Sequence, residues 1–322
     1  MLHFTSGDSS AALLERAAIE GEIVPWREAL SEGPAPLLES GGEWIEARAR
    51  FLSEEYRLGF EGVHHQLEAL EQVLARAGEA EEIVLWFDHD LFCQANFLYL
   101  LARLSMLDGR TARISRVYSG EREIGRMSSV EMNDLIETRI EITEEDLRLA
   151  RRGWQAYSSP DPRQIEEFLA EPSGRFPHLG HALRLHLERF PSVANGLGSI
   201  EQWLLSSIAS GERSFASLFA RFTSEMSGYG MGDWQIWRRL EHLARCPVPL
   251  LDLESDIEQD RAPIDADLAG QSYTLTATGH QVLACRADHI TLNGSDRWLG
   301  GTRLGAEGEG WRWSGRELKI MN

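Results

Sequence analysis

Hydrophobic and polar positions along the first 120 residues predict short strands that alternate with helices. The strand-like runs are Leu2–Thr5, Gly21–Trp26, Glu82–Phe87 and Ala112–Tyr118. The third run is almost continuously apolar, which is typical of a strand buried on both faces of a sheet. Helical spacing of apolar residues fills the intervals, for example in the segments 43–56, 62–76 and 91–104. The pattern indicates a Rossmann-like α/β domain, in which helical crossovers join parallel strands.

Beyond Met127 the pattern is helical, and we expect the strands of this sheet to stop there. Ser128 and Glu131 form a capping-box pattern, and Thr143 precedes a helix whose first turn is acidic. The segment 191–198 contains Pro, Ser, Asn and two glycines, which makes it the best candidate for a linker.

A third region begins at Ser199 and shows the order of elements of a winged-helix domain. Three helices are expected at 200–209, 214–226 and 233–245, followed by two strands around an acidic loop and a closing helix. The chain then ends in a segment that alternates like a β-hairpin. The sequence therefore predicts an α/β plus α protein of four units: a Rossmann-like domain (1–125), a helical connector (126–195), a winged-helix-like domain (196–286) and a β-hairpin tail (287–322).

The helix expected at 233–245 has two interpretations. Arg238, Arg239 and Arg245 lie on the helix that enters the major groove in a winged helix, where arginines can read guanine. Trp234 and Trp237, at helical spacing, instead indicate a packed core. The expected wing carries five acidic residues, Asp252, Glu254, Asp256, Glu258 and Asp260. Because carboxylates repel phosphates, a structural or protein-contact role is favoured over DNA binding.

The composition of the chain argues against several classes of function. The 322 residues include 32 Lys+Arg and 51 Asp+Glu, a formal net charge of -19, which opposes charge-driven binding to nucleic acid or to a membrane surface. The only lysine is Lys319, so no P-loop lysine is available. The three cysteines are isolated, and the chain has neither a signal-peptide pattern at its start nor a long apolar run. We expect a cytoplasmic protein.

The first candidate site is Thr5-x-Gly7-Asp8-Ser9, where the first strand runs into a helix. Gly7 would let the backbone approach an anion at the helix N-terminus, while Thr5 and Ser9 would add hydroxyl donors. Asp8 would repel a bare phosphate and is better suited to a metal ion, a ribose or a proton. A tight turn with Ser9 or Ser10 as N-cap is the structural alternative.

The second candidate site is Asp88-His89-Asp90, with Gln94 one turn later, directly after the buried strand. Burying charged groups costs free energy, so a charged cluster at the end of a buried strand indicates a functional role. Asp90 would also serve as a helix cap. In a doubly wound sheet the first and third strands lie side by side, so Asp8 and this cluster would face one crevice, bordered by the Glu32 loop. Carboxylates and an imidazole suit Mg²⁺ or Mn²⁺, held by Asp8 and Asp90, or an acid–base pair.

Three separated blocks resemble an uncharacterised bacterial family known only as a domain of unknown function. They are Leu2-His-Phe-Thr-Ser-Gly-Asp-Ser9, Glu32-Gly33-Pro34 and Leu85-Trp-Phe-Asp-His-Asp-Leu91 with Gln94. Asp88 stands where glutamate is common in the family. The Arg297–Gly301 and Trp311–Trp313 segments are similar to the C-terminal part of its longer members. The resemblance implies an N-terminal α/β domain and assigns no reaction.

These features predict that the α/β domain binds a phosphorylated or nucleotide-like small molecule and acts on it by metal-assisted or acid–base chemistry, as a hydrolase or transferase would. In this hypothesis Asp8, Asp88, His89 and Asp90 are catalytic. Thr5, Gly7, Ser9, Glu32 and Gln94 contact the ligand. Two alternatives remain open: a ligand-sensing transcriptional regulator that uses the winged helix, and a protein-interaction scaffold.

Overall fold

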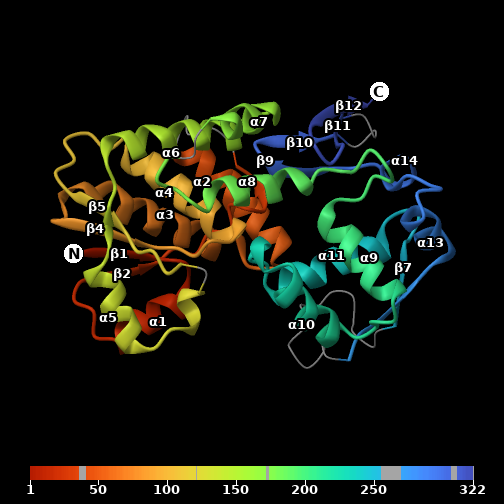
Figure 1. Ribbon diagram of the computed structural model, residues 1–322, viewed down its shortest axis with the longest axis horizontal. Helices are drawn as coiled ribbons and strands as arrows, with labels where there is room; N and C mark the ends of the chain where they lie inside the picture. The colour runs from red at the N-terminus through yellow and green to blue at the C-terminus, as the bar shows by residue number, and fades with distance from the viewer. Residues whose placement is uncertain (36–40, 121, 172–173, 255–269, 306–309, 322) are drawn as a thin grey trace.

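The computed structural model describes residues 1–35, 41–120, 122–171, 174–254, 270–305 and 310–321. An α/β domain surrounds one five-stranded sheet, and a smaller, mostly helical domain lies beside it, at the right of Figure 1. No helix among the described residues is long and apolar enough to cross a membrane.

The central sheet has the strand order β2-β1-β4-β5-β6. Its strands are β1 (Leu2–Thr5), β2 (Glu22–Pro25), β4 (Glu82–Trp86), β5 (Arg113–Arg116) and β6 (Ile140–Glu141). The first four run parallel, which confirms the predicted α/β class, and β6 adds an antiparallel edge. The expectation that strands stop at Met127 is wrong, because a strand of two residues is too short to show an alternating pattern.

Helices cover both faces of this sheet. They are α1 (Asp8–Arg16), α2 (Gly41–Glu55), α3 (Phe60–Arg76), α4 (Leu91–Leu104), α5 (Ser129–Glu137), α6 (Glu144–Tyr157), α7 (Arg163–Ala170) and α8 (Leu179–Glu188). In β4, Ile83 and Leu85 belong to the core beneath α3 and α4, while Val84 and Trp86 belong to a second core with α1 and α5. The strand is therefore buried on both faces, as its apolar run predicted.

The predicted connector 126–195 contributes to the core of the first domain. Leu147, Trp154 and Leu183, from α6 and α8, share one apolar cluster with Leu85 of β4. The capping boxes predicted at Ser128 and Thr143 are present, and each fixes the start of a helix. The core therefore continues through the predicted boundary at residue 125.

The C-terminal tail forms two hairpins. Its strands are β9 (Arg297–Gly300), β10 (Thr302–Leu304), β11 (Gly310–Trp313) and β12 (Leu318–Met321). Strand β9 also pairs in parallel with β3 (Gly33–Pro34), a strand inside a segment expected to be a loop. Gly33 has a left-handed φ of 68°, and a Cβ there would overlap the ring of Phe51. Two blocks of the family resemblance, far apart in sequence, thus meet in one small sheet.

The second domain has its own core, which includes Ile200, Leu218, Trp237 and Tyr273. Its elements are α9 (Ser199–Ala209), α10 (Phe215–Glu225), α11 (Asp233–Arg245), β7 (Leu251–Glu254), β8 (Ser272–Leu275), α13 (Ala277–Leu283) and α14 (His289–Asn293). Strands β7 and β8 are the two strands predicted around the acidic loop, and they pair antiparallel. Three acidic residues of the expected wing lie outside the described residues: Asp256, Glu258 and Asp260. A winged-helix assignment for this domain stays a prediction.

Candidate functional site

Strands β1 and β4 are parallel neighbours, with Thr5 opposite Trp86. Strand β2 lies on the other side of β1, so the strand order reverses between β1 and β4. The backbone N–H of Ser6 donates to the carbonyl of Trp86 at 3.1 Å, which holds the two strand exits together. In open α/β sheets, ligands bind outside the carboxyl ends of the strands at such a reversal. The predicted side-by-side arrangement is confirmed.

Two hollows open at this edge, and Ser6 and Gly230 line both of them. The first, here called the apolar hollow, has a volume of about 720 Å³ and is lined by Trp26, Tyr56 and Trp234 among others. The second, the acidic hollow, has about 290 Å³ and receives Asp88, Asp90, Ser9, Glu123 and Met226. Residues from both domains line each hollow, so the edge of the sheet is a crevice between domains.

Asp88, Asp90 and Cys93 form a group whose ligand atoms lie within 4.8 Å of one another. Asp88 accepts a hydrogen bond from the backbone N–H of Ile124 at 2.8 Å, and Asp90 accepts one from Cys93 at 2.8 Å as the N-cap of α4. The thiol of Cys93 lies 3.0 Å from the hydroxyl of Ser6. The capping role weighed for Asp90 is therefore present, and Asp90 combines it with a place in the cluster.

Burial changes the acidity of this group. It raises the pKa of Asp88 to about 6, against the hydrogen bond from Ile124, and the charge of Asp90 adds to the rise. Burial likewise raises the pKa of Asp90 and of the Cys93 thiol. A carboxyl group with a pKa of about 6 can take up or release a proton near neutral pH, as a general acid or base must.

His89 points to a third, small cavity. It lies there with Tyr118 and His178, and its ring centroid is 5.5 Å from that of His178. Its Nδ1 atom is buried without a hydrogen-bond partner among the described residues. Asp88 also lines this cavity, so it is the one member of the predicted triplet that touches both spaces.

Asp8 lies apart from the other carboxylates. Its side chain is 68% exposed and accepts two hydrogen bonds of 3.0 Å from Nε of Arg27, which lowers the pKa of Asp8. Asp8 lines the apolar hollow together with Arg27. The group of possible metal ligands formed by Asp88, Asp90 and Cys93 does not include Asp8, so a metal site shared by Asp8 and Asp90 stays a prediction.

The turn after β1 is built by Thr5 and Gly7. Thr5 is buried, and its hydroxyl donates to the carbonyl of Gly7 at 3.0 Å, so it shapes the turn and does not line the hollows. Gly7 has a φ of 82°, and nothing lies within 4 Å of the position a Cβ would take. It is the N-cap of α1, without a side-chain cap, so the expectation of Ser9 or Ser10 as N-cap is wrong. Ser9 is exposed on the acidic hollow.

Two further predicted site residues make structural hydrogen bonds and do not line the two hollows. Gln94 donates from Nε2 to the carbonyl of Asp88 at 2.7 Å and so fixes the loop after β4. Glu32 is buried and accepts from Arg189 at 2.7 Å and from Arg239, which ties the first domain to α11. Glu32 lines neither hollow.

Sequence reasoning missed several residues that line the crevice. Ser6 stands within the first motif, between two residues that were selected, and its hydroxyl is directed to Cys93. Tyr56 and Phe92 line the apolar hollow but lie in segments whose spacing indicated only helix. Trp234 was assigned to a core, and its indole N–H donates to the carbonyl of Glu55 at 3.0 Å across the domain boundary.

No protein-family model matches this chain, and no curated protein matches it. The resemblance to the bacterial family of unknown function therefore stays a prediction, as does membership of any enzyme class.

Proposed function

We propose that the crevice binds a phosphorylated or nucleotide-like small molecule and acts on it. The observation that carries this proposal is the reversal of strand order between β1 and β4, at the edge where the acidic hollow shares Ser6 and Gly230 with the apolar hollow of about 720 Å³. That volume lies within the range of small-molecule sites, and its wall is mostly apolar with a few polar groups, as such sites are.

Separate parts of the crevice suit the ring and the phosphate of such a ligand. The aromatic side chains of Tyr56 and Trp234 in the apolar hollow suit a flat ring such as a base. The uncapped start of α1 and the open space in front of Gly7 suit a phosphate, which the backbone N–H groups of the first turn would hold. Arg27 pairs with Asp8 beside that turn and so offsets the negative charge that would otherwise repel the phosphate.

We assign proton transfer and cation binding to Asp88 and Asp90. With a pKa of about 6, Asp88 would exchange a proton with the ligand, and Asp90 next to it disfavours a second negative charge. The two carboxylates also fit Mg²⁺ or Mn²⁺, which binds through one or two carboxylates plus substrate phosphates. When bound there, the cation would polarise a phosphoryl oxygen, in keeping with a hydrolase or transferase.

We infer that the second domain is winged-helix-like and that it closes the crevice. Its order of three helices, an antiparallel pair and a further helix supports this, as does the bridge between Ser214 and Ser272. In that arrangement α11 would be the helix that reads DNA. Arg238 and Arg239 on α11 instead pair with Glu55 and Glu32 of the first domain, so the regulator alternative is less well supported.

A thermal-shift and calorimetry screen tests this proposal, with nucleoside mono- and diphosphates and ribose 5-phosphate, each with and without Mg²⁺. We expect at least one of them to stabilise the wild type, since a ligand of the native state alone raises stability by mass action. Gly7→Ala should weaken that binding, and Asp88→Asn should remove its dependence on Mg²⁺.

Gly109→Ala is the matched control for Gly7→Ala, because Gly109 also has a positive φ with open space in front of it. Asp134→Asn, on the exposed face of α5, is the control for Asp88→Asn. A screen in which no compound stabilises the wild type, or in which all four variants bind like it, contradicts the proposed function.

A further inference from the structure

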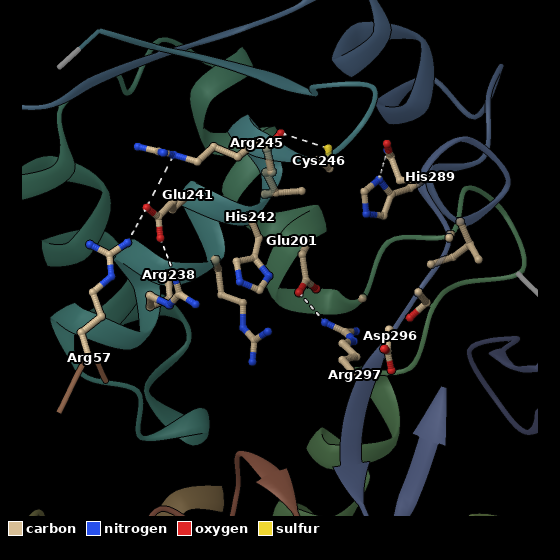
Figure 2. A pocket seen from close by; sticks show the side chains of 18 residues that line it. Arg57, Glu201, Arg238, Glu241, His242, Arg245, Cys246, His289, Asp296 and Arg297 are labelled. Carbon is tan, nitrogen blue, oxygen red and sulfur yellow. Dashed lines mark hydrogen bonds and ion pairs between the residues drawn. The ribbon is translucent and has the colours of Figure 1, made fainter. Parts of the chain in front are cut away.

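A further cavity, separate from the crevice, lies at the C-terminal part of α11. It has a volume of about 510 Å³ and is formed by α11, α9, α14, the start of β9 and the segment after α2. Five arginines and two histidines line it: Arg57, Arg238, Arg239, Arg245, Arg297, His242 and His289. We call it the arginine pocket. Figure 2 shows Glu241 joined to Arg57, Arg238 and Arg245 on one side of the pocket, and the pair of Glu201 and Arg297 on the other side.

Arginines outnumber glutamates in the ion pairs that the described residues form around the arginine pocket. Glu241 alone is shared by Arg57, Arg238 and Arg245. Glu32 is shared by two more arginines, while Glu201 and Glu55 complete the network. Among the ion pairs of the described residues, this network joins six arginines to four glutamates, and Arg57 has a further interaction besides its pair with Glu241. Asp296 lines the cavity too, but Arg303 binds its carboxylate through two nitrogens.

The pKa of Glu201 indicates a positive electrostatic field in the arginine pocket. Burial alone would raise the pKa of this carboxyl group, but Arg297 and Arg239 outweigh burial and lower its pKa to about 2. Burial lowers the pKa of Arg297 itself, against Glu201, and the neighbouring Arg239 and Arg189 lower it further. Cations that crowd one another in this way gain from an added anion.

This cluster of arginines contrasts with the chain as a whole, whose formal net charge is -19. In a strongly acidic protein, a concave site with arginines on its walls is the place where an anion is least repelled. Guanidinium groups hold phosphate oxygens through pairs of parallel hydrogen bonds. His242 and His289, whose pKa values burial lowers, would offer further donors as neutral rings.

We propose that the arginine pocket binds a small molecule through a phosphate monoester or pyrophosphate group. Such a group carries multiple negative charges near neutral pH, and five arginines line the cavity. The volume of about 510 Å³ leaves room for a phosphate with a small organic part attached to it. This site is independent of the proposed function of the crevice.

The test is isothermal titration calorimetry of the full chain with inorganic phosphate and with pyrophosphate. The double variant Arg57→Gln/Arg245→Gln should bind pyrophosphate at least about tenfold more weakly than the wild type, because it loses charge-assisted hydrogen bonds. Both arginine side chains reach solvent, with 25% and 43% of their surface exposed, so the fold should persist. Asp296→Asn, which removes a negative charge from the wall, should tighten binding by about threefold.

The matched control is Arg76→Gln/Arg163→Gln, which removes two exposed, singly paired arginines outside the pocket and changes the net charge equally. It should bind pyrophosphate like the wild type. A wild type that binds neither anion overturns the proposal, as does equal weakening in both double variants. Binding that is lost in Arg27→Gln and kept in Arg57→Gln/Arg245→Gln would place the anion in the crevice and would also overturn it. Tighter binding of a short oligothymidylate than of pyrophosphate would identify the pocket with nucleic acid instead.

Discussion

Gly230 lies directly against the carboxylate of Asp90, so that a Cβ on Gly230 would overlap Oδ1. Gly230 follows the short helix η3 (Ser227–Tyr229) of the second domain and has a left-handed φ of 64°. Asp90 caps α4 of the first domain. The contact closes the second domain on the edge of the sheet and buries the carboxylate whose pKa burial raises.

We predict that Gly230→Ala destabilises the protein by about 2–4 kcal/mol, the sum of left-handed backbone strain and overlap with Asp90. Urea unfolding measures the change. Gly109→Ala is the matched control, because Gly109 has the same φ of 64° and nothing within 4 Å of its Cβ position. If both variants lose equal stability, the contact with Asp90 contributes nothing.

The buried carboxylate of Glu32 predicts a second effect. Glu32→Gln would leave Arg189 and Arg239 without their shared counter-charge. Both arginine side chains are largely buried, with 3% and 12% of their surface exposed. We expect a loss of about 3 kcal/mol in the free energy of unfolding, the usual result of breaking a buried pair. Glu46→Gln, in an exposed pair with Arg50, should cost less than about 0.5 kcal/mol. Similar losses in the two variants would contradict the role of Glu32 in joining the domains.

Much of the sheet was predictable because its information is local. Each parallel strand carries its own apolar run, and helix starts such as Ser128 and Thr143 carry their own caps. The pairing of β3 with β9 was not predictable, because a two-residue strand, Gly33–Pro34, has no pattern and its partner lies at the other end of the chain.

The candidate site was predictable in part for the same reason. The neighbouring exits of β1 and β4 follow from the general topology of doubly wound sheets, so Asp8 and Asp88 could be placed at one edge. The side chains were harder, since each depends on a partner from a distant segment. Arg27 pairs with Asp8, and Arg239 pairs with Glu32, and neither pairing has a local signal in the sequence.

Glu82, at the start of β4, should make stability depend on acid. Its hydrogen bonds from Arg139, which outweigh burial, lower its pKa to about 2 from an ordinary 4.5. The stabilisation is therefore complete above pH 4.5 and is lost as the pH falls toward 2. Glu82→Gln should cost about 2 kcal/mol at pH 7 and much less near pH 2, measured by urea unfolding at both values. A cost that does not change with pH would show that the ion pair is not its source.

Asp88 should have the opposite effect, because burial raises its pKa to about 6 from an ordinary 3.8. Its charged form is disfavoured in the folded state, so its contribution is most favourable below pH 3.8 and is lost as the pH rises through 6. Asp88→Asn should therefore raise the free energy of unfolding by about 2 kcal/mol at pH 8 and change it little at pH 4. The asparagine oxygen can still accept from the N–H of Ile124, so the loop should keep its position.

A gain in stability together with loss of the Mg²⁺ dependence proposed above would mark Asp88 as a group kept for chemistry at the expense of stability. A variant that is less stable than the wild type at pH 8 would instead show that the carboxylate is there to hold the fold.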